Sequence, residues 1–72
     1  MTAKEMFEKL EYECETYGDE IKYTYKGNYA DVYIYFHKQI NQIEINSDKD
    51  ITFNFSMKEL KAINKQIEEL GW

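Results

Sequence analysis

Residues 21 to 37 read IKYTYKGNYADVYIYFH, and in this stretch apolar and polar side chains alternate on both sides of Gly27-Asn28. Such alternation is typical of β-strands that bury one face. A Gly-Asn pair between two alternating runs favours a two-residue hairpin turn. The sequence therefore predicts a hairpin whose strands cover residues 21–26 and 29–37.

Further strands are predicted on the C-terminal side of this hairpin. A tight turn at Lys38-Gln39 leads to a strand over residues 40–46. The polar residues 47–50 form a loop, and residues 51–55 form the last strand of the meander.

The two predicted turns determine which side chains share a face of the sheet. With two-residue turns, Lys26 lies opposite Tyr29 and His37 lies opposite Ile40. One face is then apolar and must be covered by helices, whereas the other is polar and faces solvent. The predicted covered face comprises Ile21, Tyr23, Tyr25, Ala30, Val32, Ile34, Phe36, Ile43 and Ile45. The predicted open face comprises Lys22, Thr24, Lys26, Tyr29, Asp31, Tyr33, Tyr35, His37, Gln42 and Glu44.

An N-terminal helix is predicted from a capping box, in which the Thr2 and Glu5 side chains satisfy each other's backbone amides. Apolar residues follow at helical spacing up to Leu10. The end of this helix is ambiguous. Residues 12–17 continue the helical stripe towards Gly18, but they also alternate like a short strand.

A C-terminal helix is predicted with clearer ends. Ser56 and Glu59 form a second capping box, and Phe55 can pack onto Leu60 as a hydrophobic staple. Gly71 followed by Trp72 predicts a Schellman-type end, with Trp72 folded back onto the last turn. The predicted apolar stripe of this helix comprises Leu60, Ile63, Ile67 and Leu70.

Together these elements predict an α+β fold, an antiparallel meander of three to five strands with both terminal helices on one face. Residues 1–72 form a single domain, because a chain of this length has room for only one core. The side chains expected to be buried include Phe7, Leu10, Val32, Ile34, Phe53, Leu60, Ile63 and Ile67.

Composition narrows the classes of function. The chain has a net charge of -5 and no arginine, the side chain that binds phosphate and guanine through two parallel hydrogen bonds. Direct nucleic-acid binding is therefore not expected. The single cysteine excludes an internal disulfide, no apolar run is long enough to span a membrane, and residues 1–5 do not resemble a signal peptide. We expect a cytoplasmic protein.

The sequence predicts no catalytic site, metal site or cofactor. His37 is the only histidine, and Asp31, the nearest acid on its face of the strand, lies roughly 20 Å away. Cys14 has no predicted partner and is read as a small buried apolar residue. Residues 48–50 resemble part of a calcium loop but lack its glycine and its distal glutamate.

The first candidate binding surface is acidic. Between Glu5 and Glu20 there are seven acids and one lysine. Such a segment is either a solvated face or a surface that attracts a basic partner. Its candidate binding residues are Glu8, Glu11, Glu13 and Glu15.

The second candidate surface is the row of tyrosines on the open face, represented by Tyr33 and Tyr35 with the nearby acids Asp31 and Glu44. Tyrosine is enriched at protein interfaces because it combines a large contact area with a polar tip. The alternative is that these tyrosines only pair across strands, since they favour pleated surfaces.

The two ends of the chain, MTAKEMFEKL at residues 1–10 and LKAINKQIEELGW at residues 60–72, carry a resemblance. They are similar to a group of small, mostly uncharacterised proteins encoded by phages and prophages of low-GC Gram-positive bacteria. In that group a Gly-Tyr pair often follows the first helix, where this chain has Glu11-Tyr12. The resemblance therefore favours a helix that ends near Leu10 and a short strand over residues 12–17.

The resemblance also implies a role, in which a small acidic phage protein covers a host protein such as a nuclease or another defence component. We therefore expect a protein-binding module in the bacterial host cell, acting on a host or phage protein with a basic surface. Two alternatives are a small-ligand protein that sequesters a nucleotide and a structural subunit that self-associates into a homo-oligomer. No membrane partner is expected.

Overall fold

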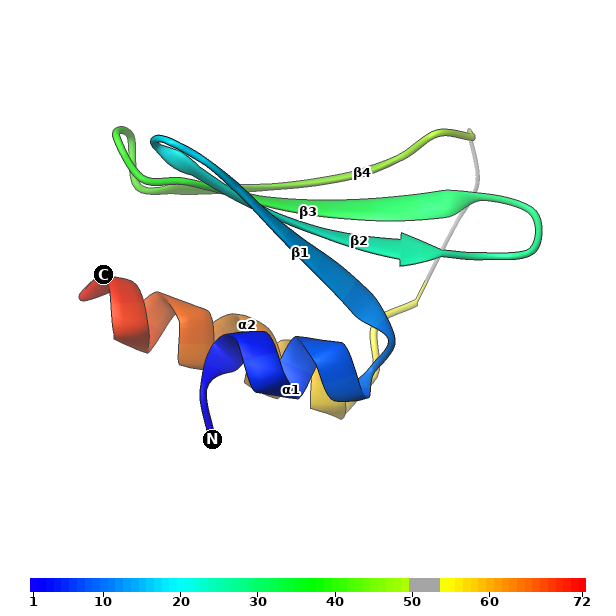
Figure 1. Ribbon diagram of the computed structural model, residues 1–72, viewed down its shortest axis with the longest axis horizontal. Helices are drawn as coiled ribbons and strands as arrows, with labels where there is room; N and C mark the ends of the chain where they lie inside the picture. The colour runs from blue at the N-terminus through cyan, green and yellow to red at the C-terminus, as the bar shows by residue number, and fades with distance from the viewer. Residues whose placement is uncertain (50–53) are drawn as a thin grey trace.

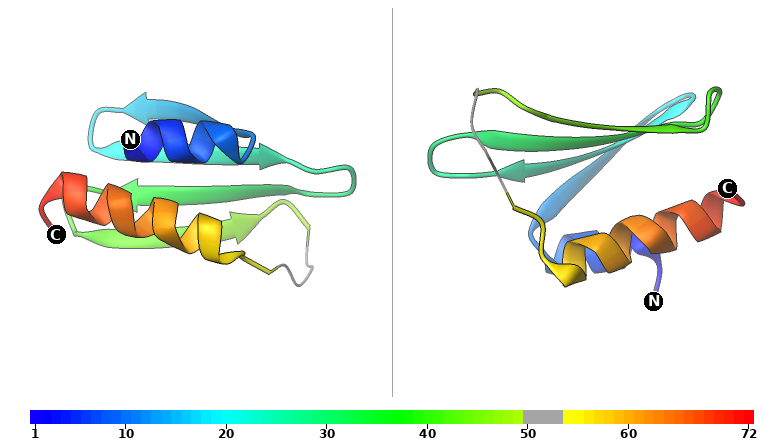
Figure 2. Two further views of the ribbon diagram at one scale, coloured as in Figure 1. Left: turned by 90° about the horizontal axis from the view of Figure 1, so that it is seen from below. Right: turned by 180° about the vertical axis from the view of Figure 1, so that it is seen from behind.

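In the computed structural model, which describes residues 1–49 and 54–72, two helices cover one face of an antiparallel sheet (Figures 1 and 2). The elements are α1 (Ala3–Lys9), β1 (Tyr12–Tyr17), β2 (Glu20–Lys26), β3 (Asp31–His37), β4 (Gln42–Ser47) and α2 (Met57–Leu70). The strands lie side by side in the order β1-β2-β3-β4. The predicted α+β meander between two terminal helices is confirmed. Residues 51–53 of the predicted last strand, including Phe53, lie outside the described residues, and Asn54 and Phe55 belong to no strand.

The ambiguous segment after the first helix is a strand, as the Glu11-Tyr12 pair favoured. α1 ends with hydrogen bonds from the Leu10 and Glu11 amides to the carbonyl oxygens of Phe7 and Glu8, each 3.0 Å long. Glu11 then adopts a left-handed conformation, with φ of 70°. This conformation, which glycine adopts more readily, turns the chain from α1 into β1.

Both predicted two-residue turns are wrong. The β2–β3 connection spans residues 27–30, so Lys26 pairs with Asp31 instead of Tyr29. The β3–β4 connection spans residues 38–41, so His37 pairs with Gln42 instead of Ile40. The two-residue type I′ turn needs positive φ at both central residues, and Gly27 and Asn28 have none.

The side chains within the observed strands nevertheless lie on their predicted faces, whereas Tyr29 and Ala30 belong to the β2–β3 connection and to no strand. Each pairing is shifted by two residues from the predicted one, and strand side chains alternate with a period of two. On β3, Val32, Ile34 and Phe36 are buried beneath the helices, whereas Tyr33 and Tyr35 are only partly covered.

The core centres on Tyr23 of β2. Its ring stacks on Phe7 of α1, with centroids 3.9 Å apart, and meets the edge of Phe36 at 6.0 Å. Its buried hydroxyl donates a hydrogen bond to the Gln66 Oε1 atom at 2.6 Å. Burial raises the pKa of this hydroxyl, so Tyr23 remains a hydrogen-bond donor. One residue thus joins β2 to both helices.

The buried stripe of α2 differs from the predicted one. Ala62, Ile63 and Gln66 are buried, but Leu60 is 41% exposed. α2 is therefore rotated from its predicted orientation towards Gln66, which accepts the hydrogen bond from Tyr23. Of the other predicted core residues, Phe7, Val32 and Ile34 are buried, while Leu10 and Ile67 are partly buried.

Both capping boxes and the predicted end of α2 are confirmed. Gly71 is left-handed, and the Trp72 amide donates to the Ile67 carbonyl oxygen at 3.1 Å, as in a Schellman motif. The Trp72 ring packs against Phe36, with centroids 6.3 Å apart. In the same last turn of α2, Glu69 Oε2 accepts a hydrogen bond from the Ala3 amide at 2.8 Å, which joins α1 to α2.

The rotation of α2 predicts that two similar apolar residues contribute differently to the free energy of unfolding. Ile63→Ala should lower the free energy of unfolding by about 2–5 kcal/mol, because it leaves a cavity in the core. Leu60→Ala should change it by less than about 1 kcal/mol, since Leu60 is 41% exposed and lies outside the buried core. Urea denaturation of both variants measures the difference, and equal losses would contradict the observed rotation.

The left-handed conformation of Glu11 predicts a gain of stability on substitution. Glu11→Gly should raise the free energy of unfolding by about 0.5–1 kcal/mol, because glycine adopts positive φ without the clash of a Cβ atom. The matched control Glu8→Gly, within α1, should lower it by about 0.5–1 kcal/mol. Thermal denaturation followed by circular dichroism compares the two, and a loss in both variants would refute this account of the junction.

Candidate functional site

The candidate site is the face of the sheet that the helices leave open. Neighbouring strands present side chains on this face in register, such as Glu15 beside Lys22 and Lys22 beside Tyr35. The residues of this open face are Glu13, Glu15, Tyr17, Glu20, Lys22, Thr24, Lys26, Asp31, Tyr33, Tyr35, His37, Gln42, Glu44 and Asn46. It therefore carries five carboxylates and two lysines.

The structure brings together six of the eight predicted binding residues. These six, which lie on the open face, are Glu13, Glu15, Asp31, Tyr33, Tyr35 and Glu44. Glu8 instead lies on α1, and Glu11 lies at the junction between α1 and β1. The acidic segment and the tyrosine row thus form one surface, because β1 pairs with β2 and turns Glu13 and Glu15 to the open side.

An aromatic row runs along β3 on this surface. The Tyr33 and Tyr35 ring centroids are 6.5 Å apart, and the Tyr35 ring stacks almost parallel to the His37 ring at 5.8 Å. The Lys22 Nζ atom lies 5.0 Å from the Tyr33 centroid and 5.7 Å from the Tyr35 centroid. These distances suit cation–π attraction between the Lys22 ammonium group and the two tyrosine rings.

His37 has two acidic partners, contrary to the expectation that it has none nearby. Its Nδ1 atom lies 3.0 Å from Glu20 Oε1, and its Nε2 atom lies 2.8 Å from Glu44 Oε1. Both acids come from strands adjacent to β3. Asp31, the acid expected to be nearest, lies on the same strand as His37, whereas both observed partners are supplied by sheet pairing with β2 and β4.

The Glu20–His37–Glu44 cluster favours the charged imidazolium. The hydrogen bond with Glu44 raises the pKa of His37 above its usual value, desolvation opposes this increase, and Glu20 adds to it. A neutral imidazole has only one N–H group and can donate to one carboxylate, whereas the imidazolium donates to both. The cluster therefore connects three strands most strongly when His37 is protonated.

Other features of the described chain add little to this site. Among residues 1–49 and 54–72, no group of three His, Cys, Asp or Glu side chains could hold a metal ion. No helix in these ranges is long and apolar enough to cross a membrane. Cys14 is partly buried on the covered face, where it packs against the core.

Comparison with known proteins gives no independent guide to function. No protein-family model matches the chain, and neither the curated proteins nor the solved structures yield a significant match.

The His37 cluster predicts a pH dependence of stability. Since the folded-state pKa is raised, the stabilising contribution is complete below about pH 6.5, the usual histidine value, and is lost as pH rises through the folded-state pKa. Titration of the single histidine by NMR should give a pKa above about 6.5 in the wild type and a lower one in Glu44→Gln.

Unfolding experiments test the same cluster through stability. The free energy of unfolding should fall as pH rises above about 6.5 and through the folded-state pKa of His37 in the wild type, and less steeply in His37→Gln. An identical pH dependence in both proteins would show that the cluster does not contribute.

Proposed function

We propose that this protein is a binding module that uses its open face to cover a basic surface of a partner protein. The observation that supports this most directly is the convergence of Glu13, Glu15 and Glu44 around the Tyr33–Tyr35 row on a face that no helix covers. Interfaces commonly combine aromatic anchors with a charged rim that matches the charge of the partner.

The charge of this face favours a basic partner over an acidic one. Lys26 forms an ion pair with Asp31 at 3.7 Å, whereas in the described chain Glu13 and Glu15 have no cationic group within 4.0 Å. Exposed carboxylates without a cationic partner attract a positive surface over a Debye length of about 8 Å at physiological ionic strength.

The tyrosines can supply the contact area that charge alone does not. A stable interface buries about 800 Å² on each partner. The molecule exposes 4953 Å², so one face of the sheet is large enough for such an interface. Tyr33 and Tyr35 lie in its middle, between acids on β1 and β4, where aromatic side chains contribute most to holding a complex together.

We propose more specifically that the partner is a host nuclease or another host defence protein and that binding inhibits it. The similarity of both chain ends to phage and prophage proteins supports this form. A nuclease binds nucleic acid through a basic surface, and an acidic module on that surface would block access by occupying it. The proposed site of action is the cytoplasm of the bacterial host.

The proposal is tested by kinetics on a captured partner. Immobilised protein is incubated with lysate of a low-GC Gram-positive bacterium, and the protein retained at physiological salt is purified. Glu13→Lys/Glu15→Lys should slow its association and flatten the salt dependence, because steering charges act on the encounter. Tyr33→Ala/Tyr35→Ala should instead speed dissociation by about tenfold or more, because buried aromatic anchors hold the formed complex.

A matched control separates the open face from net charge. Glu8→Lys/Glu11→Lys changes the charge of the chain by the same amount but lies off the open face, so association should be slowed much less. If this control variant and Glu13→Lys/Glu15→Lys slow association equally, overall charge accounts for the steering. If neither open-face variant alters either rate, the open face is not the binding surface.

A further inference from the structure

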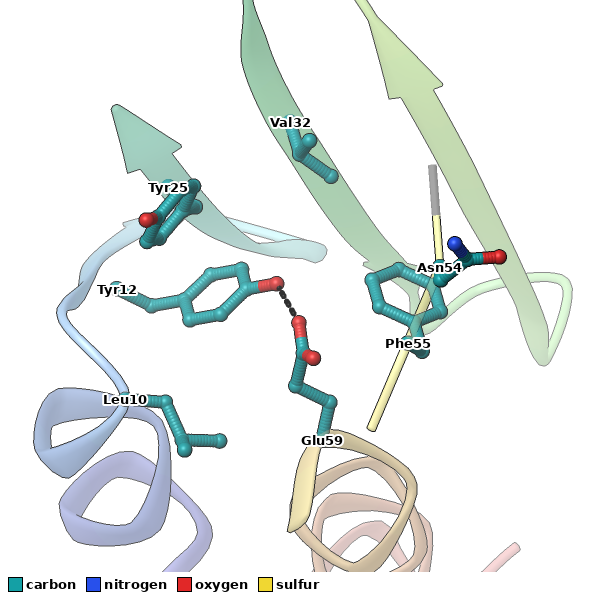
Figure 3. Close-up of a pocket in the computed structure, with 7 residues that line it drawn as sticks. All are labelled: Leu10, Tyr12, Tyr25, Val32, Asn54, Phe55 and Glu59. Atoms are coloured by element: carbon teal, nitrogen blue, oxygen red, sulfur yellow. Dashed lines mark hydrogen bonds between the residues drawn. The ribbon is translucent and has the colours of Figure 1, made fainter. Parts of the chain in front are cut away.

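A pocket lies at the end of the molecule where α2 begins and the sheet diverges from the helices (Figure 3). Its volume is about 310 Å³, and the described residues that line it are Leu10, Tyr12, Tyr25, Val32, Asn54, Phe55 and Glu59. These residues come from both layers of the fold. The pocket lies on the helical side of the sheet and is distinct from the open face.

The polar centre of this pocket is a hydrogen-bonded pair. Tyr12, which is 5% exposed, donates its hydroxyl proton to Glu59 Oε2 at 2.5 Å. Burial and the adjacent Glu59 carboxylate raise the pKa of Tyr12, so this hydroxyl keeps its proton. Figure 3 shows the two side chains pointing towards each other, with the Val32 and Phe55 side chains beyond them.

The negative charge of Glu59 is not balanced by a neighbouring cation. Its Oε1 atom accepts the Ser56 amide at 2.9 Å as part of the capping box. Across residues 1–49 and 54–72, no lysine, histidine or N-terminal nitrogen lies within 4.0 Å of this carboxylate. A carboxylate has about four acceptor positions, and within the described part of the chain Glu59 uses two of them.

We propose that this pocket binds an alkylammonium group. The positive charge would lie at Glu59, and the alkyl chain would contact the apolar walls formed by Leu10, Val32 and the aromatic rings. Aromatic rings attract an ammonium group placed over their faces, and a carboxylate accepts its N–H protons in short, charge-assisted hydrogen bonds. The volume suits a small ligand or one long side chain.

Charge complementarity distinguishes this ligand class from the others that could fill an apolar pocket. An anion would be repelled by Glu59, and a neutral apolar ligand would leave its remaining acceptor positions unused. An alkylammonium group can come from a free small amine or from a lysine side chain of a polypeptide. Both sources present the same chemistry to the pocket.

The test is a ligand titration followed by NMR on the intact protein. The probes are n-butylammonium, its neutral isostere butan-1-ol, and N-acetyl-lysine N-methylamide, which presents the amine on a peptide backbone. We expect n-butylammonium to shift the resonances of Tyr12, Tyr25 and Val32, with an affinity about tenfold or more above that of butan-1-ol. The relative affinities of n-butylammonium and the lysine derivative distinguish a free amine from a peptide side chain.

Two variants at the pocket and one control complete the experiment. Glu59→Gln keeps the capping box, because glutamine serves at this helix position, but it should weaken n-butylammonium binding about tenfold. Tyr25→Leu should also weaken it, by removing one aromatic wall. Glu68→Gln removes a charge elsewhere on α2 and should leave the affinity unchanged.

The proposal is overturned if butan-1-ol binds as well as the amine, or if Glu59→Gln binds n-butylammonium as well as Glu68→Gln does. Resonance shifts confined to the open face would equally overturn it. None of these outcomes depends on whether the open face binds a protein, so the two proposals succeed or fail separately.

Discussion

The hydrogen bond from the Tyr23 hydroxyl to Gln66 fixes how the helical layer lies on the sheet. A buried hydroxyl or amide without a partner costs free energy, so each of these groups requires the other. Because the Tyr23 ring also stacks on Phe7, α1, β2 and α2 are all held through one side chain. The exposed position of Leu60 follows from the resulting rotation of α2.

Covering only one face of the sheet makes the other available for binding. Both helices of the described chain lie on the same side of the sheet, so the polar side of the meander remains open. The acids of β1 reach this side because the chain turns at Glu11 and returns as a strand beside β2. A longer first helix would have kept Glu13 and Glu15 away from Tyr33 and Tyr35.

Side chains of the open face also contact one another across neighbouring strands. Lys22 lies over two tyrosine rings, and His37 lies between carboxylates of β2 and β4. A partner that binds here must compete with Lys22 for the tyrosine faces. The charge of His37 alters the net charge of the face and the contacts of Glu44. Binding of a charged partner would for this reason also depend on whether His37 is protonated.

The sequence by itself determined both helices, the strands over β2, β3 and β4, both capping boxes, the Gly71 end of α2 and the division of strand residues between two faces, but it left residues 12–17 open between helix and strand. These features depend on residues near each other in the chain, where periodicity and helix capping act directly. It also identified Glu13, Glu15, Asp31, Tyr33, Tyr35 and Glu44 as candidate binding residues, but as members of two surfaces. Only the tertiary structure decided the strand pairing, the partners of His37, the rotation of α2 and the pocket beside Glu59. Each of these depends on contacts between segments distant in the chain, which a pattern read along one segment does not contain.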